Sequence, residues 1–275
     1  MALFNDVFNR ASIYETLFFN IKAVLIHPTL ADLQEKNPKL FKRWQYISKS
    51  KFNQEVVDAK PLKSIITNQE DSLQLIQNNV YEEKAIYYPE FCKIVAITYA
   101  SLESVDGKLK RYFKKIVNQD EYLVIATFID VLHQLSSEAV KSTPQYFPTL
   151  CGHNIMNYDI PLLIKRFIVY RDKFDTNKKL PLIIKNALNA KPWESGVIDT
   201  VNVWKFNGSD YTPLMLIADF MELKKTVDLE ALPDMSRQYW ELIADKPDEA
   251  LEYIALQSAT QTNLVIQLMN ELRLL

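Results

Sequence analysis

The sequence predicts an α/β protein in which a mixed central sheet of about five strands is flanked by helices. Three observations predict this class. Runs rich in β-branched and aromatic residues, typical of buried strands, recur along the chain. Segments with helical periodicity separate these runs, and the last such segment is long. The order of strand, polar insertion, two strands, helix, strand, helix, strand and further helices favours one layered sheet domain.

The five expected strands differ in the strength of their signals. The first, TLFFNIKAVLI, is an apolar run that ends before a His-Pro pair. The second and third are separated by a Val-Asp-Gly-Lys turn, which predicts an antiparallel hairpin. The fourth is short, and the fifth follows a polar loop. The expected strands cover residues 16–26, 92–102, 109–116, 149–151 and 197–204.

Helices are predicted wherever apolar residues recur at intervals of three and four. The polar, Lys/Gln/Glu-rich segment at about 29–90 is interpreted as a helical insertion, so that residues 1–275 form one domain. The other expected helices cover residues 120–135, 160–170, 212–221, 233–244 and 247–274.

Composition excludes several classes of protein. The chain has 275 residues, of which 48% are hydrophobic and 12% aromatic, as expected for a sizeable core. The formal net charge of −2 provides no overall basic field for nucleic acid. Two cysteines point to a reducing compartment. No signal-peptide pattern and no run of 18 apolar residues is seen, so we expect a cytoplasmic protein without a membrane partner.

The sharpest local motif is GHNIMNYDIP at residues 152–161, where a strand gives way to a helix. Asp159 stands at the start of that helix, where the helix dipole favours a negative charge. Taken alone, the motif is better explained by a capping aspartate in a strand-to-helix turn.

The wider pattern resembles the DEDD 3′–5′ exonucleases that carry a tyrosine in their last motif, a family related to the proofreading domain of family B DNA polymerases. GHNIMNYDIPLL resembles that family's second motif. Further stretches at residues 81–99, 191–206, 211–214 and 253–268 resemble other family segments in the same order. The resemblance spans about residues 16–275 and implies a ribonuclease H-like fold with a two-metal nuclease site.

The residues expected to hold the metals are mostly replaced. Asn20 and Lys22 occupy the two acidic positions of the family's first motif, and Gln257 occupies the acidic position four residues after Tyr253. Asp159 is the one remaining carboxylate of four. Magnesium prefers carboxylate and water ligands, and an ammonium group repels a dication. We therefore expect no metal cofactor; Mg²⁺ or Mn²⁺, with Asp159 as ligand, is expected only if the protein is active.

The spacing of these residues predicts which of their side chains share a face. Asn20 and Lys22 lie two apart on a strand, and Tyr253 and Gln257 four apart on a helix, so each pair shares a face. We therefore expect the geometry of the site to be retained although most of its negative charge is lost. The Lys22 ammonium is expected near Asp159, as a cation where a metal would sit. Tyr253 is expected to be a packed remnant.

Other residues near the motif have less specific signals. His153 and Asn154 are candidate nucleic-acid contacts, although a structural role for His153 is an equal alternative. Asp199 is interpreted as structural. Two basic clusters interleaved with Trp44, Tyr46 and Tyr112 are typical of solvated faces, and single-strand binding is the alternative. The clusters are Lys39, Lys42, Arg43, Lys49 and Lys51, and Lys108, Lys110, Arg111, Lys114 and Lys115.

Three functions are compatible with these features. The favoured one is a catalytically inactive exonuclease-like protein, a pseudoenzyme that binds nucleic acid or a protein partner through the former active-site cleft. The second is a purely structural or interaction protein. The third is a metal-dependent 3′–5′ exonuclease with weak or unconventional activity.

Overall fold

The computed structural model describes residues 13–52, 69–142, 149–175, 179–189, 196–206, 208, 210–229, 232 and 234–272. They divide into two compact units. The sheet unit comprises the described residues of Met1–Lys22, Ile94–Pro233 and Leu242–Leu275, and the helical unit those of Ala23–Lys93 and Asp234–Glu241. The described part of the predicted insertion at about 29–90 lies in the helical unit. A single domain over 1–275 stays a prediction.

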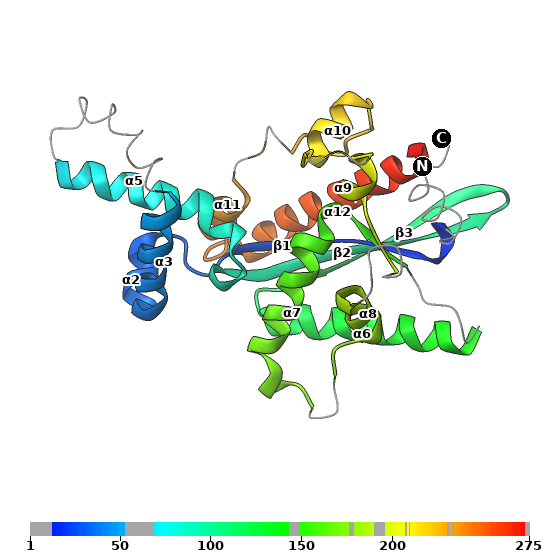
Figure 1. Cartoon of the computed structure of the whole chain (residues 1–275), viewed down its shortest axis with the longest axis horizontal. Helices are drawn as coiled ribbons and strands as arrows, with labels where there is room; N and C mark the ends of the chain where they lie inside the picture. Colours follow the sequence, from blue (N-terminus) through cyan, green and yellow to red (C-terminus); the bar gives the residue numbers. More distant parts are fainter. Residues whose placement is uncertain are drawn as a thin grey trace. The chain divides into compact units, whose positions relative to one another are not determined.

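A five-stranded mixed sheet forms the centre of the sheet unit (Figure 1), which confirms the predicted α/β class. The strand order is β3-β2-β1-β4-β5. β4 pairs in parallel with both β1 and β5, whereas β2 and β3 are antiparallel. The strands are β1 (Thr16–Leu25), β2 (Cys92–Val105), β3 (Lys108–Val117), β4 (Thr149–Gly152) and β5 (Val197–Asp199).

Helices cover both faces of this sheet. Successive side chains of β1 point to opposite faces. Phe19 packs against Phe128 of α6 (Glu121–Ser142), with ring centroids 5.5 Å apart. Phe18 belongs instead to a core cluster with Leu264 and Leu268 of α12 (Pro247–Leu272). Figure 1 shows α6 and α12 on opposite sides of the strands.

The β2–β3 hairpin has the turn that the sequence predicts. Asp106 and Gly107 both have positive φ values, 53° and 70°, as a type I′ hairpin turn requires at its two central residues. The pairing runs from Ala96 opposite Val117 to Val105 opposite Lys108. β3 is an edge strand of the sheet, and its first eight residues are all exposed.

The fifth predicted strand is wrong beyond Asp199. β5 ends there, and residues 200–204 form a short helix, α9 (Thr200–Trp204). The Asp199 carboxylate accepts a hydrogen bond from the Val201 N–H at 3.1 Å, which caps the helix and stops the strand. The apolar run in this segment was compatible with either structure, because short runs do not separate strand from helix by periodicity.

The predicted helices are present with shifted ends, and α8 was not predicted. The largest shift is in α6, which extends seven residues beyond its predicted end at 135. The others in the sheet unit are α7 (Ile160–Val169), α8 (Leu182–Asn189) and α10 (Leu214–Phe220), with short turns η1 (Ile13–Glu15), η5 (Ile155–Asp159) and η6 (Arg171–Lys173).

The helical unit is built around Trp44, which is 1% exposed. Its indole makes edge contacts with Tyr81 and Phe91 at 5.4 and 5.2 Å between ring centroids. Trp44 is therefore a core residue and is not available as a surface aromatic. The elements of this unit are α2 (Leu30–Lys36), α3 (Pro38–Lys51), α5 (Gln69–Lys84), η3 (Ala85–Tyr87), η4 (Pro89–Phe91) and α11 (Met235–Leu242).

One buried ion pair ties three elements of the sheet unit together. Glu121, at the start of α6, forms a direct ion pair with Arg166 of α7. The same carboxylate accepts hydrogen bonds from the Ile94 N–H at 2.6 Å, from Arg166 Nε at 2.8 Å and from the Tyr170 hydroxyl at 3.1 Å. Each buried charge thus has a direct partner, as burial demands.

None of the helices in the described ranges combines the length and the apolar content that a membrane crossing requires.

Candidate functional site

Asn20 and Lys22 both face α12 from β1. The Ser258 hydroxyl lies 3.2 Å from the Asn20 carbonyl oxygen and 3.3 Å from its side-chain Oδ1, and can donate to either. The Lys22 ammonium donates to Gln261 Oε1 at 2.7 Å. The shared face expected from their spacing is therefore present. The sequence pattern does not single out Ser258 or Gln261, because neither belongs to a motif; their positions on one side of α12 are the only signal.

Asp159 reaches β1 from the turn between β4 and α7. Its Oδ1 accepts a hydrogen bond from the Ile21 N–H at 2.7 Å and does not cap α7. β1 pairs with β4 only as far as Phe18, so the turn rather than a strand lies beside Ile21. Gly152 permits this close approach, because a Cβ there would lie 2.8 Å from the Phe19 carbonyl oxygen and 2.2 Å from an Ile155 methyl group.

Burial shifts the pKa values of both ionisable groups at this site toward neutrality. Asp159 is 3% exposed, and this desolvation raises the pKa of its carboxyl to about 7, against the lowering effects of the Ile21 hydrogen bond and the Lys22 charge. Desolvation lowers the pKa of Lys22 to about 8, although the charge of Asp159 opposes the shift. Each charge therefore stabilises the other only in part.

The pairing expected between Lys22 and Asp159 takes an indirect form. The two groups interact electrostatically. The ammonium nevertheless makes its hydrogen bond to the neutral Gln261 amide, and the Asp159 carboxylate makes its own to backbone. Lys22 is thus a cation within the site, but it is not in direct contact with the carboxylate.

Tyr253 and Gln257 lie on α12, two turns and one turn before Gln261 respectively. Tyr253 is partly buried. Gln257 is 7% exposed, and within the described part of the chain its amide has no hydrogen-bond partner. Gln257 lies one turn before Gln261, the partner of Lys22, so the two glutamines share a side of α12. We name the group Asn20, Lys22, Tyr253, Gln257 and Asp159 the Lys22 site.

Asp199 holds the turn that carries Asp159. Its two carboxylate oxygens accept hydrogen bonds from the N–H groups of Asn154 at 2.8 Å, Met156 at 3.0 Å and Val201 at 3.1 Å. Burial raises the pKa of Asp199, and these three donors oppose the rise. Asp199 is therefore structural, and its oxygens are already engaged.

His153 and Asn154, proposed as nucleic-acid contacts, make contacts inside the fold. Nε2 of His153 donates to the Thr212 carbonyl oxygen at 3.0 Å, since a carbonyl only accepts. Nδ1 then accepts from the Thr200 hydroxyl at 2.9 Å. Burial lowers the pKa of His153 to about 4, so the ring is neutral. The Asn154 Oδ1 accepts from the Asn157 amide at 3.2 Å, and its backbone is left-handed, with φ 64°.

The ligand set of the Lys22 site does not fit two magnesium ions. Magnesium requires hard oxygen ligands, largely carboxylates, and a two-metal site needs several of them. Here Asp159 is the single carboxylate of the site, it already accepts a backbone hydrogen bond, and Lys22 adds a positive charge. Across the residues that the structure describes, no group of three or more His, Cys, Asp and Glu side chains could hold a metal ion.

Comparisons with protein-family models, with curated proteins and with solved structures found no match to this chain.

Proposed function

We propose that the chain is a catalytically inactive exonuclease-like protein whose Lys22 site binds nucleic acid. The proposal rests on the resemblance of its motifs to the DEDD exonucleases with a tyrosine in the last motif, on a ribonuclease H-like strand order, and on the chemistry of the site. The single observation that carries it is the Lys22 ammonium, which donates to the Gln261 amide at a position where the family resemblance implies a metal-binding carboxylate.

The donors of the Lys22 site suit phosphate oxygens better than metal ions. Lys22 supplies an ammonium, and Gln257 supplies amide hydrogens with no partner among the described residues. The Asn20 Oδ1 lies within hydrogen-bonding distance of Ser258, which leaves its amide hydrogens for a ligand. Ammonium and amide groups are common phosphate contacts in protein–nucleic acid complexes. A protein partner is the alternative occupant of this site.

Cleavage assays test the absence of catalysis. Single-stranded DNA and RNA are incubated with the protein and with an Asp159→Ala variant, in Mg²⁺ and in Mn²⁺. We expect no cleavage by either protein. Cleavage by the native chain that disappears in the variant would overturn the proposal and support the metal-dependent nuclease.

Binding assays test whether the Lys22 site binds nucleic acid. We expect the native chain to bind single strands with an affinity that falls steeply with salt, and Lys22→Met/Gln257→Ala to weaken that binding about tenfold. If neither cleavage nor binding is detected, a structural or interaction protein is the better description of this chain.

Restoring the carboxylates tests whether the site has kept its geometry. The Asn20→Asp/Lys22→Glu/Gln257→Asp variant is expected to melt a few degrees higher in low-millimolar Mg²⁺ than without it, because a metal bound only by the native state stabilises it by mass action. The native chain and a Lys22→Gln control are expected to show no shift. A triple variant that folds but ignores Mg²⁺ would show that these positions do not form a two-metal geometry.

A further inference from the structure

α3, in the helical unit, carries five cationic side chains and no acidic one. Lys39, Lys42, Arg43, Lys49 and Lys51 are all exposed on the helix PKLFKRWQYISKSK. None of them forms an ion pair within the described part of the chain. Like charges three and four residues apart on a helix repel each other. A helix with this composition therefore maintains a positive surface at some cost to its own stability.

The exposed aromatic of α3 lies within this positive surface. Tyr46 is 74% exposed and stands three and four residues after Arg43 and Lys42. At 100° per residue, Lys39, Lys42, Arg43, Tyr46 and Lys49 occupy one side of the helix. We name these five residues the α3 basic face. Trp44 points the opposite way, into the core. Surfaces that bind single-stranded nucleic acid combine these two features, because bases stack on aromatic rings while phosphates contact the cations.

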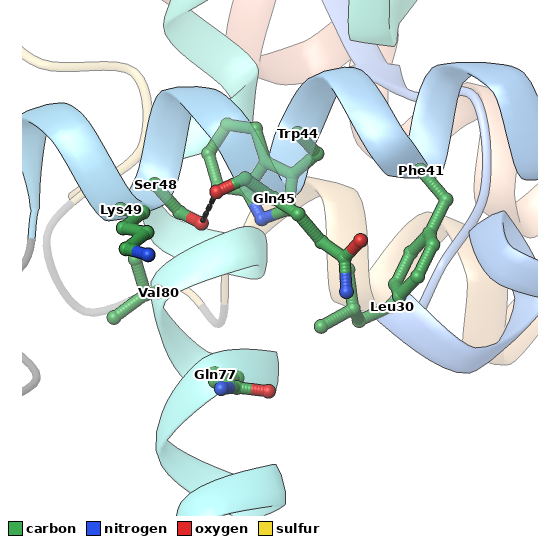
Figure 2. A pocket seen from close by; sticks show the side chains of 8 residues that line it. All are labelled: Leu30, Phe41, Trp44, Gln45, Ser48, Lys49, Gln77 and Val80. Atoms are coloured by element: carbon green, nitrogen blue, oxygen red, sulfur yellow. Dashed lines mark hydrogen bonds between the residues drawn. The ribbon is translucent and has the colours of Figure 1, made fainter.

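A pocket adjoins the α3 basic face and shares Lys49 with it. It lies between α2, α3 and α5 and encloses about 260 Å³. Figure 2 shows Lys49 and Val80 toward one end, Leu30 and Phe41 toward the other, and Gln45 between them. The lining combines an apolar part with polar side chains: Leu30, Phe41, Trp44 and Val80, and Gln45, Ser48, Lys49 and Gln77.

The lining suits a flat ring with polar edges. Gln45 projects from α3 and Gln77 from α5, and neither amide has a partner among the described residues. The Ser48 hydroxyl donates to the backbone carbonyl oxygen of Gln45 at 3.2 Å, so this hydrogen bond does not engage the side-chain amide of Gln45. Amides can read the hydrogen-bonding edge of a base, and unstacked bases of single strands are recognised by this combination of apolar contact and edge contact.

We propose that the α3 basic face and its adjoining pocket bind single-stranded nucleic acid, with the phosphate backbone along the cations and one unstacked base in the pocket. The chemistry of two adjacent features carries the proposal: a helix whose cations form no ion pair with any acidic residue that the structure describes, and a cavity with apolar and amide lining. In a duplex the bases are paired and stacked, so they cannot enter such a pocket without being flipped out.

The other basic cluster, on β3, is less suited to this role. Two of its five cations are engaged by α12: Lys115 pairs with Glu252 at 3.0 Å, and Arg111 donates to Asn263 at 2.7 Å. Charges on an edge strand also have an established structural purpose, since they prevent pairing with other chains. β3 therefore provides a control of similar charge.

Fluorescence anisotropy with labelled oligonucleotides of about 12 nucleotides tests the proposal, since single-strand sites span roughly 4–16 nucleotides. The Lys42→Glu/Lys49→Glu variant is compared with Lys108→Glu/Lys110→Glu, which makes the same charge change on β3. We expect the α3 variant to weaken single-strand binding at least tenfold and to flatten its salt dependence, and the β3 control to weaken it less than threefold.

The pocket is tested separately by Gln45→Ala/Gln77→Ala, which leaves every charge in place. We expect this variant to lose the native chain's preference among homopolymeric oligonucleotides. Equal losses in both charge variants, duplex binding as tight as single-strand binding, or equal displacement by polyglutamate would each overturn the proposal. If only Lys22→Met/Gln257→Ala weakens binding, the α3 site fails and the Lys22 site stands; if only the α3 variant weakens it, the reverse holds.

Discussion

Glu121 and Asp159 are equally buried carboxylates of one unit, each 3% exposed, but their surroundings differ. Glu121 contacts the Arg166 guanidinium directly and accepts further hydrogen bonds from Ile94 and Tyr170. Asp159 accepts one from Ile21, and the cation coupled to it donates elsewhere. The same burial therefore yields a satisfied ion pair in one place and a poorly compensated pair of charges in the other.

The pKa values of the two cations, Arg166 and Lys22, reflect this difference in surroundings. Burial opposes the charge of Arg166, but the hydrogen bond and charge of Glu121 outweigh it and raise the pKa of Arg166. At Lys22 burial prevails and the pKa falls to about 8. A direct partner is thus what separates a structural ion pair from a site held near neutrality, and perturbed groups of the second kind are typical of functional sites.

Breaking the satisfied pair should have the largest effect. Glu121→Ala leaves Arg166 buried without its partner and should lower the free energy of unfolding by about 3–5 kcal/mol. Urea denaturation measures it. The Glu121→Ala/Arg166→Met double variant removes both charges and should recover part of the loss. A loss below about 1 kcal/mol for the single variant would mean that the pair is not a structural anchor.

The poorly compensated carboxylate should appear in the pH dependence. The folded-state pKa of Asp159, about 7, lies above its ordinary value of 3.8. The folded state therefore holds the proton more tightly, and this contribution to stability, present below pH 3.8, is lost as the pH rises through about 7. We expect Asp159→Asn to abolish a decline on the order of 2–4 kcal/mol over that range. Parallel pH profiles of the native and variant chains would contradict the assignment.

Removing the Lys22 charge should have the smallest effect. Lys22→Met keeps the apolar stem and removes an ammonium that burial disfavours and whose hydrogen-bond partner is neutral. We expect the free energy of unfolding at pH 7 to change by less than about 1 kcal/mol. Arg166→Met, measured alongside, should lose several times more. A loss above about 2 kcal/mol at Lys22 would remove the contrast between the two sites.

The fold was predictable where local signals agree with tertiary packing. The apolar run of β1, the Asp106-Gly107 turn and the periodicity of α12 each specify an element without outside help. The segment after Asp199 was not predictable, because the five residues TVNVW suit either a strand or a helix and a side-chain cap decided between them.

The candidate site was predictable in its membership but not in its contacts. Spacing places Asn20 and Lys22 on one face, but nothing local indicates that Lys22 would donate to Gln261, 239 positions away. The Glu121–Arg166 pair was missed for the same reason. Its one signal is Arg166, an arginine in the largely apolar run IPLLIKRFIV. Trp44 was misjudged because an aromatic among lysines can belong to either side of an amphipathic helix.

The end of β1 has a consequence for how the chain folds. The Leu25 N–H donates to the Ser236 hydroxyl oxygen at 3.0 Å, and the Leu25 carbonyl oxygen accepts from the Trp240 indole at 3.0 Å. These partners stand 211 and 215 positions later in the sequence. During synthesis, the Leu25 N–H and carbonyl oxygen therefore stay hydrogen-bonded to water until α11 has left the ribosome. Such non-local closure slows folding and prolongs the exposure of an unpaired strand end to other chains.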